Sequence, residues 1–276
     1  GARSLAELRA RSAREIQLAH RRGGTGSGSN NNPSDAARGV FDTNWPIVDG
    51  HVLPQSPFDL FSQGRQNDVP LLSGTVANEG ATMPCVETLH AFEAQARADH
   101  GEQADHFLRL YSAGSDPEAR EASRTAFSYR NFYWQNFCWN ELQARTGRAP
   151  VYAYEFTRIP PMPANADYDE NMPDKFGAFH GSEIPYVFRT FSVREWAWSE
   201  ADSVLADTIS SYWINFARSG DPNAAGLPLW PAYEASGRMT MELGDSVKAR
   251  PVRNLPRLQF WDAFYTAQRQ RNRITA

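Results

Sequence analysis

Cysteine is scarce in this sequence of 276 residues, which contains only Cys85 and Cys138. Two cysteines cannot form the disulfide framework of a small extracellular domain, and one widely separated pair lacks the spacing of a zinc site. We therefore expect two buried or half-buried thiols. A single bridge between them, or from one of them to a segment outside this sequence, is the alternative.

Long apolar runs and an excess of positive charge are also absent. No stretch reaches the roughly 18 to 20 consecutive apolar residues that a helix needs to cross a bilayer, so we expect no membrane span. The 28 basic and 32 acidic residues are interspersed, give a net charge of −4 and form no basic stripe, which argues against nucleic acid as a partner. No two histidines share a helical face with a carboxylate, so no metal site is expected.

A serine nucleophile is the third absence. The turn that exposes a catalytic serine has the pattern Gly-x-Ser-x-Gly, because only small neighbours fit this strained turn. No serine here has glycine both two residues before it and two residues after it; around Ser27 these positions hold Thr25 and Ser29. The His-Gly-Gly-Gly segment of an oxyanion hole is missing as well. A serine-dependent reaction would need a nucleophile from outside this sequence.

The sequence does contain a histidine surrounded by small residues, His180, in the segment Gly177-Ala178-Phe179-His180-Gly181-Ser182-Glu183. Glycines on both sides let the backbone turn sharply and let the imidazole project into a cleft, as a general base requires. Upstream, the apolar run Val69–Val76 is typical of a buried strand and is followed by Glu79. Glu79 and His180 are therefore candidates for the acid and the base of a Ser-Glu-His triad. Glu183 is interpreted as a helix-capping or ion-paired carboxylate.

The order of expected elements predicts an α/β layered architecture, because strands alternate with long helical segments. With 41% hydrophobic residues, the chain can bury a large core, either as one large domain or as two small ones. A loop rich in Gly, Ser and Asn at about residues 23–36 is expected to be flexible. Strands are predicted at Val69–Val76, Val151–Phe156 and Met239–Leu243, and helices at Phe58–Gln63, Val86–Tyr111, Pro117–Arg145, Asp202–Arg218 and Arg257–Asn272.

Several motifs, in the same order along the chain, resemble type-B carboxylesterases, the cholinesterase-like family. The opening Ser4–Arg9 is similar to a stretch that this family has after its serine turn. The other segments that carry the resemblance are Trp45–Pro54, Asp68–Gly80, Gly177–Phe188 and Trp213–Asn223 with Trp230-Pro231.

The resemblance implies an α/β-hydrolase fold, with residues 1–276 as the C-terminal part of a single domain and of a central, mostly parallel sheet flanked by helices. It implies hydrolysis of small carboxylic esters through an acyl-serine intermediate, with Glu79 as acid and His180 as base, and without a metal or an organic cofactor. The serine and the oxyanion hole would lie in an upstream N-terminal half, attached covalently or associated as a separate chain. The chain alone is expected to be inactive.

Two residues next to the predicted triad, Met83 and Phe179, are candidates for the substrate pocket. The aromatic clusters Phe132–Trp134 and Phe137–Trp139 could line an acyl or alcohol pocket, but they are interpreted as core, because aromatic residues at helical spacing are usually buried. The alternative function is a catalytically inactive, cholinesterase-like binding or adhesion module. A third hypothesis takes the chain as one product of a cut within a longer esterase. The sequence upstream of Gly1 would discriminate among them.

Overall fold

The computed structural model describes residues 3–15, 48–163 and 176–274. The chain divides into two compact units, Gly1–Pro54 and Gln55–Ala276. A single domain over the whole chain stays a prediction, and the loop predicted at about 23–36 lies outside the described residues.

The described part of the first unit includes a short helix near the N-terminus and a turn before the second unit. Helix α1, Leu5–Arg9, begins after Ser4, whose Oγ accepts the N–H of Glu7 at 3.2 Å. Further along, Asp49 Oδ1 accepts three successive backbone N–H groups, those of His51 at 2.9 Å, Val52 at 2.9 Å and Leu53 at 3.1 Å. The Asp49 side chain thus closes the turn at Asp49-Gly50.

The second unit is built on a four-stranded sheet in the order β1-β2-β3-β4. Strands β1, β2 and β3 are parallel, and β4 is antiparallel to β3, so the predicted mostly parallel sheet is confirmed. The first three strands lie where the apolar runs predict them, whereas the fourth was not predicted. The strand bounds are Leu71–Val76, Val151–Phe156, Met239–Leu243 and Val247–Pro251.

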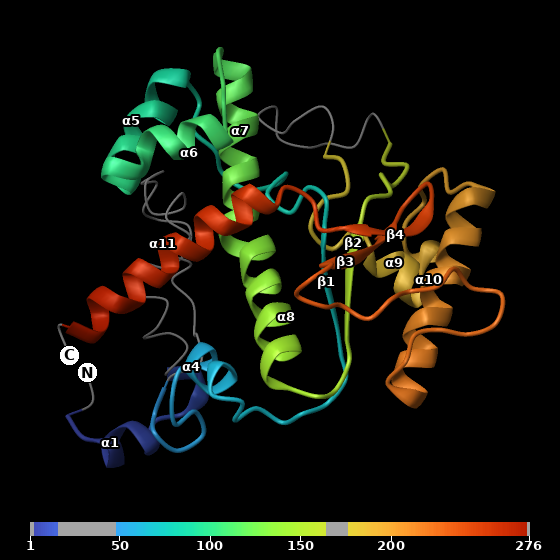
Figure 1. The fold of residues 1–276 in the computed structure, drawn as a ribbon, viewed down its shortest axis with the longest axis horizontal. Helices are drawn as coiled ribbons and strands as arrows, with labels where there is room; N and C mark the ends of the chain where they lie inside the picture. Colours follow the sequence, from blue (N-terminus) through green and yellow to red (C-terminus); the bar gives the residue numbers. More distant parts are fainter. Residues whose placement is uncertain (1–2, 16–47, 164–175, 275–276) are drawn as a thin grey trace. The chain divides into compact units, whose positions relative to one another are not determined.

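Helices cover both faces of the sheet, with α8 on one side and α10 on the other (Figure 1). The first face carries α7, Asp116–Ser128, which continues through the π-helical segment Tyr129–Tyr133 into α8, Trp134–Thr146. The terminal helix α11, Leu255–Ile274, packs against α8 and the π-helical segment. Helix α4, Pro57–Ser62, contacts α8, and residues of α7, α8 and α11 belong to a core rich in aromatic side chains.

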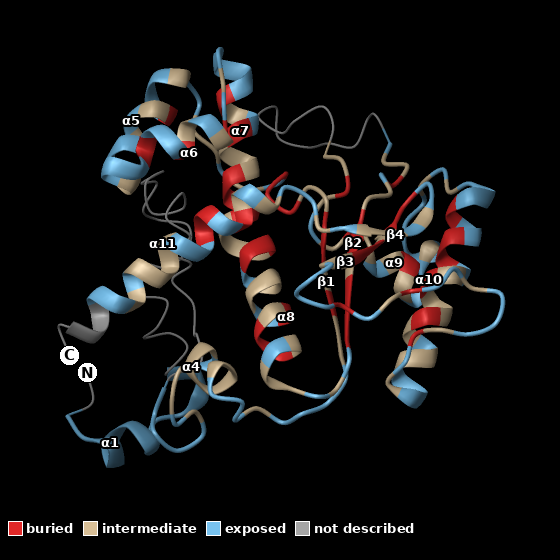
Figure 2. Ribbon diagram, in the orientation of Figure 1, coloured by how far each residue is buried: buried red, intermediate tan, exposed pale blue. Residues whose placement is uncertain are grey.

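The opposite face is covered by α9, Ile184–Phe188, and α10, Glu200–Ser219. A capping box fixes the start of α10, because the Ser199 side chain accepts the N–H of Asp202 while the Asp202 side chain accepts the N–H of Ser199. Buried residues are concentrated on the strands and on the sheet-facing sides of α8 and α10 (Figure 2). The α/β layers that the sequence predicts are therefore present.

The helix predicted over Val86–Tyr111 is instead two helices, α5, Leu89–His100, and α6, Ala104–Leu110. The break falls at Gly101, whose φ of +52° is rarely adopted by residues with a side chain. Across the described ranges, no helix is long and apolar enough to cross a membrane.

Candidate active site

Glu79 lies in the turn that follows β1 and is only 4% exposed. Its Oε1 accepts the backbone N–H of Val76, the last residue of the strand, at 2.9 Å. The next residue must be glycine, since a Cβ on Gly80 would lie 2.4 Å from the carbonyl oxygen of Arg124. Ser128 Oγ accepts the Gly80 N–H at 2.8 Å. The turn is thus held by backbone contacts, which fix the direction of the Glu79 carboxylate.

The loop that carries His180 is joined to the same turn by a β-bridge between Asn78 and Phe179. The Asn78 N–H donates to the Ala178 carbonyl at 2.9 Å, and the Ala178 N–H donates to Asn78 Oδ1 at 3.0 Å. Gly177 has φ +61°, and a Cβ there would lie 2.2 Å from Asn78 Oδ1. The glycine before His180 is therefore required for this close approach.

His180 Nδ1 lies 2.6 Å from Glu79 Oε2, although the two residues are 101 positions apart. The His180 side chain is 54% exposed, and its ring packs against Phe132 with ring centroids 4.9 Å apart. The hydrogen bond to Glu79 raises the pKa of His180 above its ordinary value. A carboxylate on Nδ1 favours the tautomer with the proton there, and the lone pair of Nε2 is then available to accept a proton.

The two predicted pocket residues lie close to this pair in the sequence and are half-buried. The Met83 N–H donates to the Gly80 carbonyl at 3.0 Å, and the Phe179 ring meets the Phe176 ring edge-on at 6.0 Å. Phe132, which was expected to be an ordinary core residue, contacts the imidazole. No pattern in the sequence distinguishes it from its aromatic neighbours.

Two polar groups beside His180 have no hydrogen-bond partner within the described part of the chain. They are Ser182 Oγ and Glu183 Oε2, and both atoms are buried. Burial raises the pKa of Glu183. The interpretation of Glu183 as a helix cap or ion-paired group is wrong, because it makes no side-chain capping bond and no ion pair. Buried oxygens without a partner cost free energy, so Ser182 and Glu183 can each accept a further hydrogen bond at this place.

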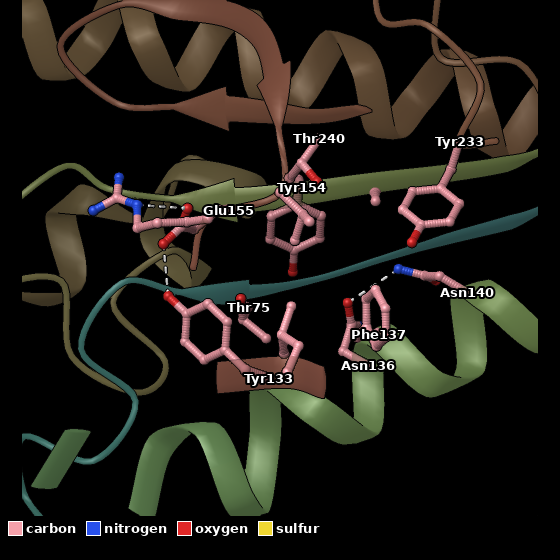
Figure 3. Close-up of a pocket in the computed structure, with 13 residues that line it drawn as sticks. Thr75, Tyr133, Asn136, Phe137, Asn140, Tyr154, Glu155, Tyr233 and Thr240 are labelled. Atoms are coloured by element: carbon pink, nitrogen blue, oxygen red, sulfur yellow. Dashed lines mark hydrogen bonds and ion pairs between the residues drawn. The ribbon is translucent and has the colours of Figure 1, made fainter. Parts of the chain in front are cut away.

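A second buried carboxylate, Glu155 of β2, lies on the α8 side of the sheet (Figure 3). Its Oε1 accepts the Tyr133 hydroxyl at 2.6 Å, and its Oε2 pairs with Arg250 and with Arg253, the latter at 3.4 Å. Tyr133, Glu155 and Arg253 border a cavity of about 30 Å³, the size of a water site. Neither Glu79 nor His180 lines it, and every oxygen of Glu155 is already engaged.

Across residues 3–15, 48–163 and 176–274, no three His, Cys, Asp or Glu side chains form a cluster that could hold a metal ion. Cys85 and Cys138 are half-buried free thiols. Burial raises the pKa of Cys138 to about 11, which keeps this thiol protonated and unreactive near neutral pH.

Solved structures with the same arrangement identify the class of fold. Structures of a PNB esterase and of a thermophylic PNB esterase each give a TM-score of 0.67 at 22% identity, and they match 93% of this chain and 50% of their own. The fold is the α/β-hydrolase fold, and this chain spans about half of those structures.

The sequence match assigns the family. Residues 5–261 match the carboxylesterase family, and the chain belongs to it. Relatives include fumonisin B1 esterase of Sphingopyxis macrogoltabida, 31% identical over 73% of this chain and 37% of that protein. Human (Homo sapiens) cocaine esterase is 29% identical over 78% of this chain and 40% of that protein. The chain thus spans about two fifths of the length of these relatives.

Proposed function

We propose that the protein is a serine-dependent carboxylic-ester hydrolase in which this chain supplies the acid, Glu79, and the base, His180. The observation that carries the proposal is the 2.6 Å contact between a buried carboxylate and a half-exposed imidazole whose second nitrogen is free to accept a proton. Membership of the carboxylesterase family supports ester hydrolysis as the reaction.

In this reaction His180 Nε2 takes the proton of a serine hydroxyl as the serine oxygen attacks the ester carbonyl carbon. His180 then donates this proton to the departing alcohol, which leaves an acyl-serine. A water molecule, deprotonated by His180, then attacks the acyl carbon, and His180 returns the proton to the serine oxygen as the bond to the acyl carbon breaks and the carboxylic acid is released. Glu79 holds the imidazole in the required tautomer and stabilises the imidazolium that forms twice in each cycle.

The serine and the oxyanion hole come, on this proposal, from a segment outside this sequence that completes a single domain with residues 1–276. The buried and unpaired oxygens of Ser182 and Glu183 support a missing partner at this place. Met83 and Phe179 are proposed to line the substrate pocket. This chain by itself is proposed to be inactive.

The test uses the protein encoded by the complete gene and a chromogenic aryl ester. We expect hydrolysis that a serine-directed reagent abolishes and that His180→Gln lowers by about 10⁵- to 10⁶-fold. His90→Gln is the matched control, because His90 is an exposed histidine on α5, away from the pair. A complete protein without hydrolytic activity, or with another residue in place of the upstream serine, would favour the binding module instead.

A further inference from the structure

A pocket of about 310 Å³ lies directly beside the Glu79 turn. It shares two residues with the framework of the candidate site, Asn78 before Glu79 and Gly177 in the loop that carries His180. The rest of its lining comes from the end of β1, from the last turns of α7 and from residues near the end of β2 and the start of the His180 loop.

The cation in this lining is Arg124, and no carboxylate in the described part of the chain neutralises it. Its Nε is buried and has no hydrogen-bond partner, and its guanidinium makes no ion pair with any described carboxylate. Other partly buried arginines are paired: Arg158 with Asp202 at 2.8 Å, and Arg238 with Glu141 at 3.0 Å. Because a buried N–H group without an acceptor costs free energy, the partly buried Arg124 is the group in this pocket with an interaction still to make.

Neighbouring polar groups of the pocket are already engaged. Ser128 Oγ accepts the Gly80 N–H and donates to the Arg124 carbonyl at 2.9 Å. The Thr125 hydroxyl donates to Glu121 Oε1 at 3.5 Å, and Glu121 itself is exposed and forms no ion pair with Arg124. The backbone of Arg124 is pressed against Gly80, which fixes the position of this residue relative to the Glu79 turn.

We propose that this pocket is a carboxylate-binding site with Arg124 as its recognition group. A guanidinium offers paired N–H donors that match the two oxygens of a carboxylate, and it stays charged at every physiological pH. The link to catalysis rests on the proposed function. An esterase meets carboxylates from two sources, the acid that it releases and a second carboxylate on a substrate that is a half ester.

The binding test uses the full-length protein and isothermal titration calorimetry with succinate, with dimethyl succinate as the uncharged probe. We expect saturable binding of succinate alone, weakened by about tenfold to a hundredfold in Arg124→Gln. Arg120→Gln, on the exposed side of the same helix and paired with Glu87, is the matched control and should bind like the wild type. Arg124→Lys keeps the charge and should bind succinate with intermediate affinity. This variant replaces Arg124→Gln in the test if the glutamine variant does not fold.

Two outcomes overturn the proposal: no saturable succinate binding by the wild type, or equal affinity in the wild type and Arg124→Gln. Neither depends on catalysis, so a failure of the proposed function is seen separately, as absent hydrolysis with binding intact. Where hydrolysis is present, kinetics distinguish the sources. The measured quantity is the ratio of kcat/KM for a half ester to kcat/KM for the neutral diester. If this ratio falls tenfold in Arg124→Gln but not in Arg120→Gln, the bound carboxylate belongs to the substrate. If the ratio is unchanged but succinate inhibits Arg124→Gln more weakly, the bound carboxylate belongs to the released acid.

Discussion

Two buried carboxylates of this chain, Glu79 and Glu155, differ in what they are bonded to. Their exposed fractions are 4% and 3%, and both belong to the strand region of one sheet. Glu155 is enclosed by the Tyr133 hydroxyl and by Arg250. In Glu79, one oxygen accepts the Val76 N–H and the other contacts the half-exposed ring of His180.

The hydrogen-bond or ion-pair partner of a buried carboxylate, rather than its burial, therefore distinguishes a structural group from a catalytic candidate. An arginine stays protonated, so the Glu155 cluster cannot move a proton near neutral pH and can only stabilise the packing of β2 with β4. An imidazole gains and loses its proton near neutral pH, so the pair of Glu79 and His180 can transfer a proton under these conditions. The predictions below test this contrast.

The largest effect is expected for Glu79→Gln in the full-length protein. The amide cannot stabilise the imidazolium and permits the wrong tautomer, so kcat for an aryl ester should fall by about 10⁴-fold. Steady-state hydrolysis measures this loss, with Glu93→Gln on the exposed face of α5 as the control. A fall of less than tenfold would remove Glu79 from the proposed triad.

The next largest effect is on stability. Arg250→Ala leaves the buried Glu155 carboxylate short of a counter-charge, and the free energy of unfolding should fall by about 3 kcal/mol. Chemical denaturation measures the change. Arg189→Ala breaks an exposed pair with Asp207 and should cost less than about 1 kcal/mol. Equal losses in the two variants would contradict the structural role assigned to Glu155.

The third prediction concerns pH. Because the hydrogen bond to Glu79 raises the pKa of His180 in the folded protein, hydrolysis should increase with pH through a midpoint above the ordinary histidine value of about 6.5. The same pKa shift makes protonated His180 stabilise the folded protein. This contribution to the free energy of unfolding is complete below about pH 6.5 and is lost as the pH rises through the pKa of His180 in the folded state. The difference in unfolding free energy between wild type and His180→Gln should therefore shrink from pH 5 to pH 8. A constant difference would contradict the shift.

The smallest effect is expected for Glu183→Gln. The charge of Glu183 contributes to the raised pKa of His180, so its removal should lower that pKa by less than about one unit. Titration of the His180 ring signals by NMR in the full-length protein measures the change. An upward shift of the His180 pKa would contradict the proposed influence of Glu183.

Elements with a strong local signal were predicted correctly. The apolar runs of β1, β2 and β3 identify buried strands, and the helix predicted over Asp202–Arg218 lies within α10. Strand β4 was missed because Lys248 and Arg250 interrupt its apolar residues, and it forms by pairing with β3. The continuous helix predicted over Val86–Tyr111 was wrong because Gly101 breaks it in a conformation that composition alone did not indicate.

The family, the layered fold and the candidates Glu79 and His180 could be inferred from the sequence, because glycine spacing, strand composition and chain order can be observed without coordinates. Folding alone places Phe132 against the imidazole and joins Asn78 to the His180 loop, and within the described ranges it leaves Arg124 Nε without a partner. Each of these contacts joins residues far apart in the chain. Their energies depend on the distances and burial that folding creates, and no local pattern in the sequence records them.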